Sequence, residues 1–207
     1  DNTGGDDLNG EEHLVVIGGT PQYSLNELPI TTYYNYGYSQ QIYTKDEIGI
    51  NSGTITKIAF KQSNDAIYTR SNVVVYMQNT TKASYSSGSD WVNVTDDTKV
   101  FEGSLTTPGT NGNLEITLDT PLKYTGENLL ISICDESGVY NSKSYFYIYE
   151  TVGNRSIYTV NDDAPYTSLN MNGSVSGSRD GYNNYIEITI MTAGSSEPTP
   201  EAPSAPQ

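Results

Sequence analysis

"NVVVYMQ", residues 72–78, is an uninterrupted apolar run that is dominated by β-branched valines and flanked by polar residues. β-Branched side chains favour extended backbone, and a strand that is apolar at consecutive positions must be covered on both of its faces. This stretch therefore predicts a strand in the interior of a layered β-structure.

Similar short segments recur along the chain and are separated by turn-forming Gly, Asn, Asp and Pro residues. They are "HLVVIGG" (13–19), "YSQQIYT" (38–44), "TITKIAF" (54–60), "KVFEGSL" (99–105), "NLEITLD" (113–119), "ENLLISIC" (127–134), "SYFYIYE" (144–150), "RSIYTV" (155–160) and "YNNYIEITIM" (182–191). Many short strands at such spacing indicate an all-β sandwich or barrel. We expect a jelly-roll-like antiparallel β-sandwich.

Helical signals are confined to one or two short turns. Thr44 and Glu47 have the S/T-x-x-E spacing of a capping box, and Gly49 is placed to end a helix after one or two turns. The segment "TTKASYSSGSDW" (80–91) has room for a second single turn. Neither turn is long enough to form a helical layer.

The composition divides the chain into three parts. Residues 1–13 are acidic, Gly-rich and free of aromatic side chains, which predicts a flexible leader. Residues 14–192 contain the predicted strands and form one β-sandwich domain. Residues 193–207 are rich in Pro, which is typical of a semi-rigid linker, so we expect the domain to be tethered to further domains of the same chain.

The charge balance limits the classes of partner. Asp and Glu outnumber Lys and Arg by 25 to 10, and the formal net charge of -15 opposes binding to nucleic acid or to anionic lipid. No apolar run is long enough to span a bilayer, so we expect no membrane insertion. The single cysteine, Cys134, cannot form an intramolecular disulfide and is expected to be a small core residue.

Catalytic motifs are scarce. His13 is the only histidine and lies at the edge of the predicted leader, so we expect no histidine-based triad and no multi-histidine metal site. A glycosidase needs only two carboxylates across a cleft, and this alternative stays open. Its candidate acids are Glu102, Glu115, Asp119, Asp135, Glu136, Glu150 and Glu187.

Paired acids in turn-like stretches are the candidate metal ligands. Asp96 and Asp97 form one pair, and Asp162 and Asp163 form another, with Asp135 and Glu136 as a third pair of the same kind. Carboxylate and carbonyl oxygens in such turns can hold a structural calcium ion, although Asx turns explain the same residues without a metal. We expect no other cofactor.

Tyrosines supply the candidate ligand-binding residues. In "SYFYIYE", Tyr145, Tyr147 and Tyr149 alternate with Phe146 and Ile148, so a strand would place the three tyrosines on one face and the apolar pair in the core. Three such rings can stack on sugars, or they can instead pair with aromatic rings across neighbouring strands.

Earlier aromatic residues extend the candidate set. Strand periodicity would place Tyr34, Tyr36 and Tyr38 on one face of "TTYYNYGYSQQIYT" (31–44). Trp91, the only tryptophan, lies in a turn-rich segment and is either a core residue or an exposed anchor. Tyr34, Tyr36 and Trp91 therefore join the predicted ligand-binding residues.

Four stretches together resemble a known module. "LPITTYYNYGYSQQIYTKDEIG" (28–49), "GTITKIAF" (53–60), "NVVVYMQNTTKASYSSGSDW" (72–91) and "YFYIYETVGNRSIY" (145–158) resemble a recurrent β-sandwich module of large secreted and surface proteins from gut and oral Gram-negative anaerobes. That module is similar to cleaved-adhesin type domains. The resemblance covers about residues 18–190 and implies a non-catalytic accessory domain that is secreted or on the cell surface.

These observations predict a binding or adhesion module of a larger protein. The preferred partner is a glycan that stacks on tyrosines, and a surface protein is the other partner considered. One alternative is a structural spacer or protein-interaction domain without a small ligand. A second alternative is a glycoside-cleaving enzyme that uses a pair of carboxylates.

Overall fold

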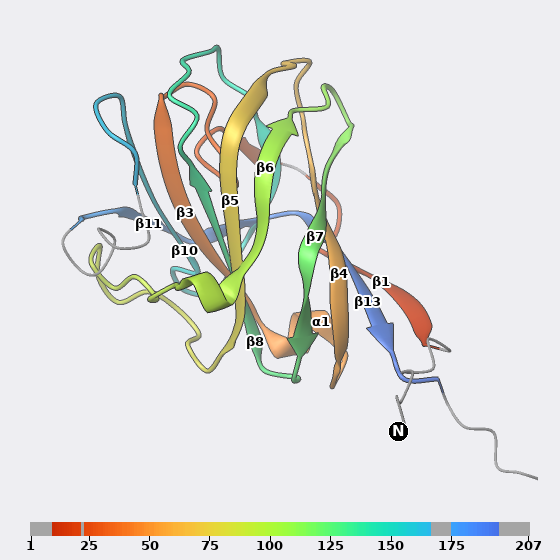
Figure 1. Cartoon of the computed structure of the whole chain (residues 1–207). Coiled ribbons are helices and arrows are strands. Elements are labelled where there is room, and N and C mark those ends of the chain that lie inside the picture. Colours follow the sequence, from red (N-terminus) through yellow and green to blue (C-terminus); the bar gives the residue numbers. More distant parts are fainter. Residues whose placement is uncertain (1–9, 22, 167–174, 195–207) are drawn as a thin grey trace, which may run out of the picture.

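Two antiparallel sheets packed face to face form the body of the computed structural model, which describes residues 10–21, 23–166 and 175–194 (Figure 1). The predicted all-β sandwich with short helical turns is confirmed. One sheet has the order β1 (Glu11–Ile17), β13 (Ile186–Thr192), β4 (Gly53–Lys61), β7 (Asn113–Tyr124). The other has the order β11 (Ser178–Asp180), β10 (Ser156–Asn161), β3 (Tyr36–Tyr43), β8 (Asn128–Asp135), β5 (Thr69–Thr80), β6 (Lys99–Thr106).

The main core lies between these two sheets. Isoleucines at alternate positions of β13 face inward, and the register pairs Ile188 with Ile58 and Ile186 with Phe60 of β4. All four of these side chains have no exposed surface. Complete burial of each such side chain contributes roughly 1.5–3 kcal/mol, so this interface is the main source of stability.

β5 is buried on both faces, as its sequence predicts. Val73, Val75 and Met77 belong to the main core, whereas Val74 and Tyr76 belong to a second apolar cluster on the opposite face. The second cluster is covered by residues from the long connection between β5 and β6, among them Tyr85, Trp91 and Val94. It also contains Cys134, which is buried as expected.

A third, three-stranded sheet has the order β12 (Tyr182–Asn184), β9 (Phe146–Glu150), β2 (Tyr23–Leu25). Buried amides connect it to β3. The Gln41 side chain donates to Asn184 Oδ1 at 2.8 Å and accepts from the Asn184 backbone at 2.7 Å. Because both residues are fully buried and bonded to each other, their polar groups are satisfied away from water.

The short helix α1 (Lys45–Ile48) follows the predicted signals. The Thr44 backbone N–H donates to Glu47 Oε2 at 2.9 Å, the Thr44 side chain accepts from the Glu47 backbone, and Gly49 ends the helix with φ of 69°. The second turn is the 3₁₀-helix η1 (Asp96–Thr98), which lies after Trp91 and not before it. No helix among the described residues is long and apolar enough to cross a membrane.

The first strand starts earlier than the predicted domain boundary at residue 14. β1 includes Glu11, Glu12 and His13, which were assigned to the leader, and Glu11 pairs with Thr192 of β13. β1 is an edge strand, where charged side chains are tolerated because one side of the strand faces water. Composition alone therefore placed this boundary too far along the chain.

Glu47 also connects α1 to the six-stranded sheet. Its carboxylate makes a bidentate pair with Arg155, at 2.5 and 2.9 Å, and accepts from the Tyr149 hydroxyl at 3.0 Å. Burial alone would raise the pKa of Glu47, but the hydrogen bonds from Arg155 and Thr44 outweigh it and lower the pKa. Glu47 is therefore held as a carboxylate in the folded protein.

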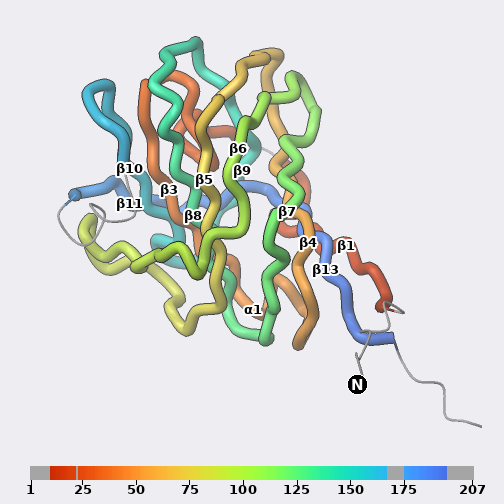
Figure 2. Tube along the Cα trace, in the orientation of Figure 1, coloured from red at the N-terminus to blue at the C-terminus, as the bar shows by residue number. Residues whose placement is uncertain are grey.

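The loops that carry the candidate site lie together at one end of the sandwich, the upper end in Figures 1 and 2. They are the segment before β3 and the loops that follow β4, β6 and β8. Both α1 and the outer ends of β1 and β13 lie at the opposite end. We call the upper set the loop end.

Two valines give a matched test of the core. Val75 has no exposed surface and Val152 is 94% exposed. We expect Val75→Ala to lower the free energy of unfolding by roughly 1.5–3 kcal/mol, because it removes buried methyl groups and leaves a cavity. Val152→Ala should change it by less than about 0.5 kcal/mol. Urea denaturation followed by tryptophan fluorescence measures both, and equal effects would contradict the assigned core.

The lowered pKa of Glu47 predicts an acid-sensitive contribution to stability. A carboxyl whose pKa is lower in the folded state stabilises the fold above its ordinary pKa of 4.5, and this contribution is lost as the pH falls below that value. We expect Glu47→Gln to cost about 1–3 kcal/mol at pH 7 and less at pH 3. Urea denaturation at both pH values tests this, with the exposed Glu150→Gln as the control.

Candidate functional site

Three tyrosines are in ring contact at the loop end, and we call them the aromatic cluster: Tyr33, Tyr34 and Tyr140. The Tyr33 ring centroid lies 5.4 Å from that of Tyr34, edge to face, and 5.2 Å from that of Tyr140. Such separations are favourable for aromatic pairs. Tyr140 is 57% exposed, while Tyr33 and Tyr34 are partly buried. The cluster therefore presents aromatic surface to solvent from defined positions.

Lys143 adds a positive charge to this cluster. Its ammonium lies 4.9 Å from the centroid of the Tyr33 ring, within the range of a cation–π interaction. A hydrogen bond with Tyr33 raises the pKa of the Tyr140 hydroxyl, and the nearby negative charge of Asp162 acts in the same direction. The Tyr140 hydroxyl is therefore protonated and can donate a hydrogen bond at neutral pH.

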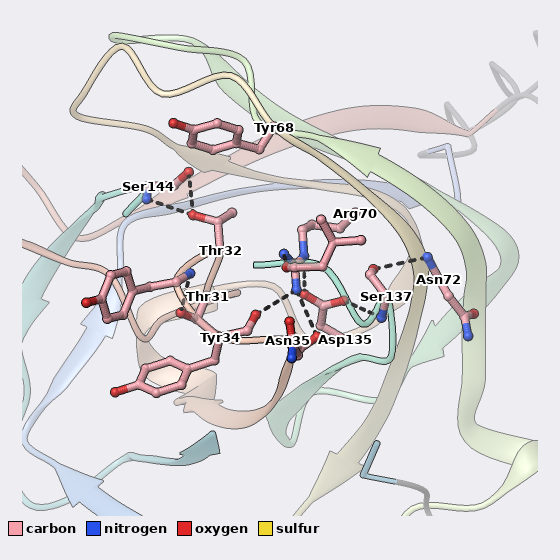
Figure 3. Close-up of polar contacts among 12 residues, drawn as sticks. Thr31, Thr32, Tyr34, Asn35, Tyr68, Arg70, Asn72, Asp135, Ser137 and Ser144 are labelled. Atoms are coloured by element: carbon pink, nitrogen blue, oxygen red, sulfur yellow. Dashed lines mark hydrogen bonds and ion pairs between the residues drawn. The ribbon is translucent and has the colours of Figure 1, made fainter. Parts of the chain in front are cut away.

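A buried ion pair contacts the backbone of Tyr34 and Asn35, which carries part of the cluster (Figure 3). Arg70 and Asp135 are almost fully buried, and Arg70 Nε lies 2.5 Å from Asp135 Oδ2. The same guanidinium donates to the backbone carbonyls of Tyr34 at 2.9 Å, Asn35 at 3.1 Å, and Val139. One side chain thus fixes the backbone of both loops that carry the aromatic cluster.

The surroundings of Asp135 reflect this burial. Desolvation raises the pKa of the Asp135 carboxyl, and the Arg70 charge and the Ser137 hydrogen bonds act in the opposite direction. Ser137 donates its backbone N–H to Asp135 Oδ1 at 3.0 Å. Because each oxygen of the carboxylate has a donor, the pair is satisfied inside the protein.

Further hydrogen bonds join the same loops. The Thr32 hydroxyl donates to the Ser142 carbonyl at 2.6 Å and accepts from the Ser144 backbone at 2.9 Å. The Asn64 side chain, from the loop after β4, donates to the Lys143 carbonyl at 2.9 Å. The backbone of the segment that carries Tyr140 and Lys143 is therefore fixed on several sides.

Asp162 connects the cluster to the turn after β10. Its Oδ1 accepts from the Asn35 backbone at 2.9 Å, and its carbonyl accepts from the Asn35 side chain at 2.9 Å. Asp163 lies in an Asx turn, where its backbone donates to Asn161 Oδ1 at 2.9 Å. These hydrogen bonds involve Asp162 Oδ1, the Asp162 carbonyl and the Asp163 backbone N–H.

The other predicted metal ligands are on a different element. Asp96 and Asp97 form the first turn of η1, between β5 and β6. Within the described ranges, no group of three or more His, Cys, Asp or Glu side chains is arranged to hold a metal ion. The calcium prediction thus gains no support from the arrangement of these residues.

The predicted tyrosine stripe follows the expected alternation but does not form one open surface. Phe146 and Ile148 are buried, and the three tyrosines are partly buried. Tyr149 packs against the main core, and its hydroxyl donates to Glu47. Tyr147 donates instead to Asn111 Oδ1 at 3.3 Å, and Tyr145 lies at the end of the stripe beside the loop after β4.

Two other predicted ligand residues pack against the second cluster. Trp91 lies 5.1 Å from the Tyr38 ring and donates its indole N–H to the Val175 carbonyl at 3.0 Å. Tyr36 starts β3 and is partly buried on the same cluster. Tyr34 precedes the strand, so strand alternation does not govern it, and it lies in the aromatic cluster instead.

The acids considered for catalysis have structural partners in several cases. Glu102 pairs with Lys99 at 2.8 Å, and Glu115 pairs with Lys57 at 3.8 Å. Asp135 is paired with Arg70. In each case a cationic side chain of the protein itself already occupies the carboxylate. These three acids are therefore better suited to structural roles.

Three contributors to the site were not predicted: Tyr33, Tyr140 and Lys143. Tyr140 is the single aromatic residue in the polar segment "ESGVYNSKS" (136–144), and this isolation was the available signal for an exposed ring. Comparisons with models of protein families, with curated proteins and with solved structures found no match to this chain. The geometry of the loop end thus carries the functional argument.

The buried ion pair gives a direct test of how the loop end is held. Asp135→Asn should lower the free energy of unfolding by about 3–5 kcal/mol, because it leaves the Arg70 charge buried without its counter-ion. Glu115→Gln, which breaks a surface pair, should cost less than about 1 kcal/mol. Chemical denaturation compares them, and a small effect of Asp135→Asn would show that the loops do not depend on the pair.

Proposed function

We propose that this chain is a non-catalytic binding module that holds carbohydrate against the aromatic cluster of Tyr33, Tyr34 and Tyr140. One observation carries the proposal: a tyrosine that is 57% exposed, Tyr140, is in ring contact with Tyr33 on backbone that the buried Arg70 fixes. Exposed rings on fixed loops are suited to binding a partner.

The chemistry of tyrosine supports this choice. The ring provides a flat apolar surface for the C–H face of a sugar, and the hydroxyl provides hydrogen bonds to sugar hydroxyl groups. Tyr140 and Tyr33 place two such rings 5.2 Å apart at an angle of 52°, so a sugar on one ring also meets the edge of the other. Little conformational entropy is lost on binding, because the loops are already ordered.

The wider setting is also a proposal. We infer a secreted or cell-surface accessory module, tethered to further domains, that recognises a glycan or a glycosylated surface protein. The resemblance of residues 28–49 and 72–91 to modules of surface proteins supports this setting. The net charge of -15 supports neutral or cationic partners and argues against nucleic acid.

A matched pair of tyrosines tests the proposal. Tyr140 and Tyr23 are 57% and 60% exposed, and each is in contact with one other tyrosine ring, but Tyr23 lies on β2, outside the aromatic cluster. We expect Tyr140→Ala to weaken glycan binding at least about tenfold, as at other aromatic hot spots, and Tyr23→Ala to leave it unchanged.

Glycan-array screening, followed by affinity gel electrophoresis with and without calcium, provides the measurement. Both variants are first shown to unfold at the same urea concentration as the wild type. Failure of the wild-type protein to bind any glycan would contradict the proposal, and so would equal losses in the two variants. If glycan binding required calcium, the paired carboxylates would again be candidate metal ligands.

A second candidate function is docking of a protein partner at the loop end. Ile67 and Val139 are 64% and 42% exposed there, and aliphatic side chains beside tyrosines are typical of protein interfaces. Ile67→Asp separates the two candidates, because it should abolish a protein interface while leaving sugar stacking on Tyr140 largely intact.

A further inference from the structure

Resting on the proposed carbohydrate-binding function, we propose that the loop end selects glycans that carry an unacetylated amino group. The ammonium group of such a sugar would lie between the face of the Tyr33 ring and the carboxylate of Asp162. The sugar ring that carries it would stack on Tyr140. The ligand class is therefore an amino sugar and not a neutral or acidic glycan.

The Tyr33 ring already holds an ammonium group of the protein. Lys143 Nζ lies 4.9 Å from the ring centroid. The face of an aromatic ring carries negative electrostatic potential, so a cation is attracted to it. Lys143 makes no ion pair with a carboxylate in the part of the chain that the structure describes. Its charge is therefore free to move away from the ring when another cation replaces it.

The carboxylate of Asp162 lies beside the aromatic cluster. Its Oδ1 accepts from the Asn35 backbone, which holds the side chain in place. Its Oδ2 has no hydrogen-bond donor among the described residues, and the residue is exposed. The carboxylate lies near enough to Tyr140 for its negative charge to help raise the pKa of that hydroxyl, so it is held beside the aromatic cluster, where it can pair with a cationic group.

The charge of the whole molecule also favours a cationic ligand. The chain has 25 acidic and 10 basic side chains, which gives a formal net charge of -15. Such a field raises the local concentration of cationic ligands and lowers that of acidic glycans. A polysaccharide with protonated amino groups therefore approaches this surface more readily than a neutral or anionic one.

The distances within the cluster favour a sugar over a simple cation. In an amino sugar the ammonium is attached directly to the ring, so one residue can contact two neighbouring surfaces. Tyr33 and Tyr140 are 5.2 Å apart, which matches a stack on one ring and an ammonium on the other. A bare ammonium compound would use the Tyr33 face and Asp162 but leave the Tyr140 ring unused.

The test uses two oligosaccharides that differ only in acetylation. Isothermal titration calorimetry compares a hexamer of β-1,4-linked glucosamine with the hexamer of N-acetylglucosamine. We expect the unacetylated hexamer to bind at least about fivefold more tightly, since an exposed cation–π contact and an exposed ion pair each contribute a modest factor. Equal affinities, or tighter binding of the acetylated form, would overturn the inference.

Matched charge variants distinguish a local contact with Asp162 from general attraction by the net negative charge of the protein. Asp162→Asn and Asp46→Asn change the net charge equally, and Asp46 lies on α1 at the opposite end of the molecule. Asp162→Asn should weaken binding of the glucosamine hexamer about threefold to tenfold, and Asp46→Asn should not. Equal effects of the two variants would show non-specific attraction and would overturn the inference.

A lysine variant should change the affinity in the opposite direction to Asp162→Asn. Lys143→Gln removes the resident ammonium from Tyr33, so it should tighten binding of the glucosamine hexamer about twofold or more. Lys123→Gln makes the same change of charge at an exposed position on β7 and should have no comparable effect. Weaker binding after Lys143→Gln would instead indicate a site for an anionic group and would overturn the inference.

Two outcomes distinguish this inference from the function on which it rests. If the acetylated hexamer binds as well as the unacetylated one and Tyr140→Ala abolishes both, the binding function stands and only the amino-sugar selectivity is overturned. If no glycan binds, both are overturned. A lysine hexapeptide serves as a further probe. If it binds as tightly as the glucosamine hexamer, and Asp162→Asn weakens both equally, the site recognises lysine side chains of a protein partner and the amino-sugar inference is overturned.

Discussion

The arrangement of the loop end depends on one buried cation. Arg70 is a β5 residue with no exposed surface, and its guanidinium bonds to Asp135 of β8 and to backbone carbonyls of two separate loops. Removing a guanidinium from water is costly, and only a close carboxylate with several acceptors offsets that cost. The loops before β3 and after β8 are therefore tied to the sheet, because their carbonyls complete the set of acceptors.

The layered sheet makes this arrangement available. β5 is covered on both faces between Val73 and Met77, and near its start Arg70 is buried while Thr69 and Ser71 are exposed. The cover on the outer face also encloses the second apolar cluster around Tyr38 and Trp91. Aromatic residues that the sequence makes equally suited to binding lie in different environments. Tyr36, Tyr38 and Trp91 belong to the second cluster, and Tyr149 packs against the main core. The aromatic cluster lies on the loops that are tied to Arg70.

Much of the fold could be predicted from local sequence, and less of the site could. The capping box of Thr44 and Glu47 and the alternation in "SYFYIYE" are local patterns, and the structure has both. The partners of the same side chains are not local: Glu47 meets Arg155 and Tyr149, which lie more than a hundred residues away. Periodicity shows which side chains share a face of a strand. It does not show which layer of the protein packs against that face.

The sequence by itself determined the all-β class, most of the strand positions, the burial of Cys134 and the acidic surface, because these follow from residue type and short-range spacing. Only the tertiary structure decided which tyrosines meet. Tyr33 and Tyr140 are adjacent because their loops end at the same edge of the sandwich and share bonds to Arg70. Contacts between residues so distant in sequence arise from the pairing order of the strands, which residue spacing does not encode.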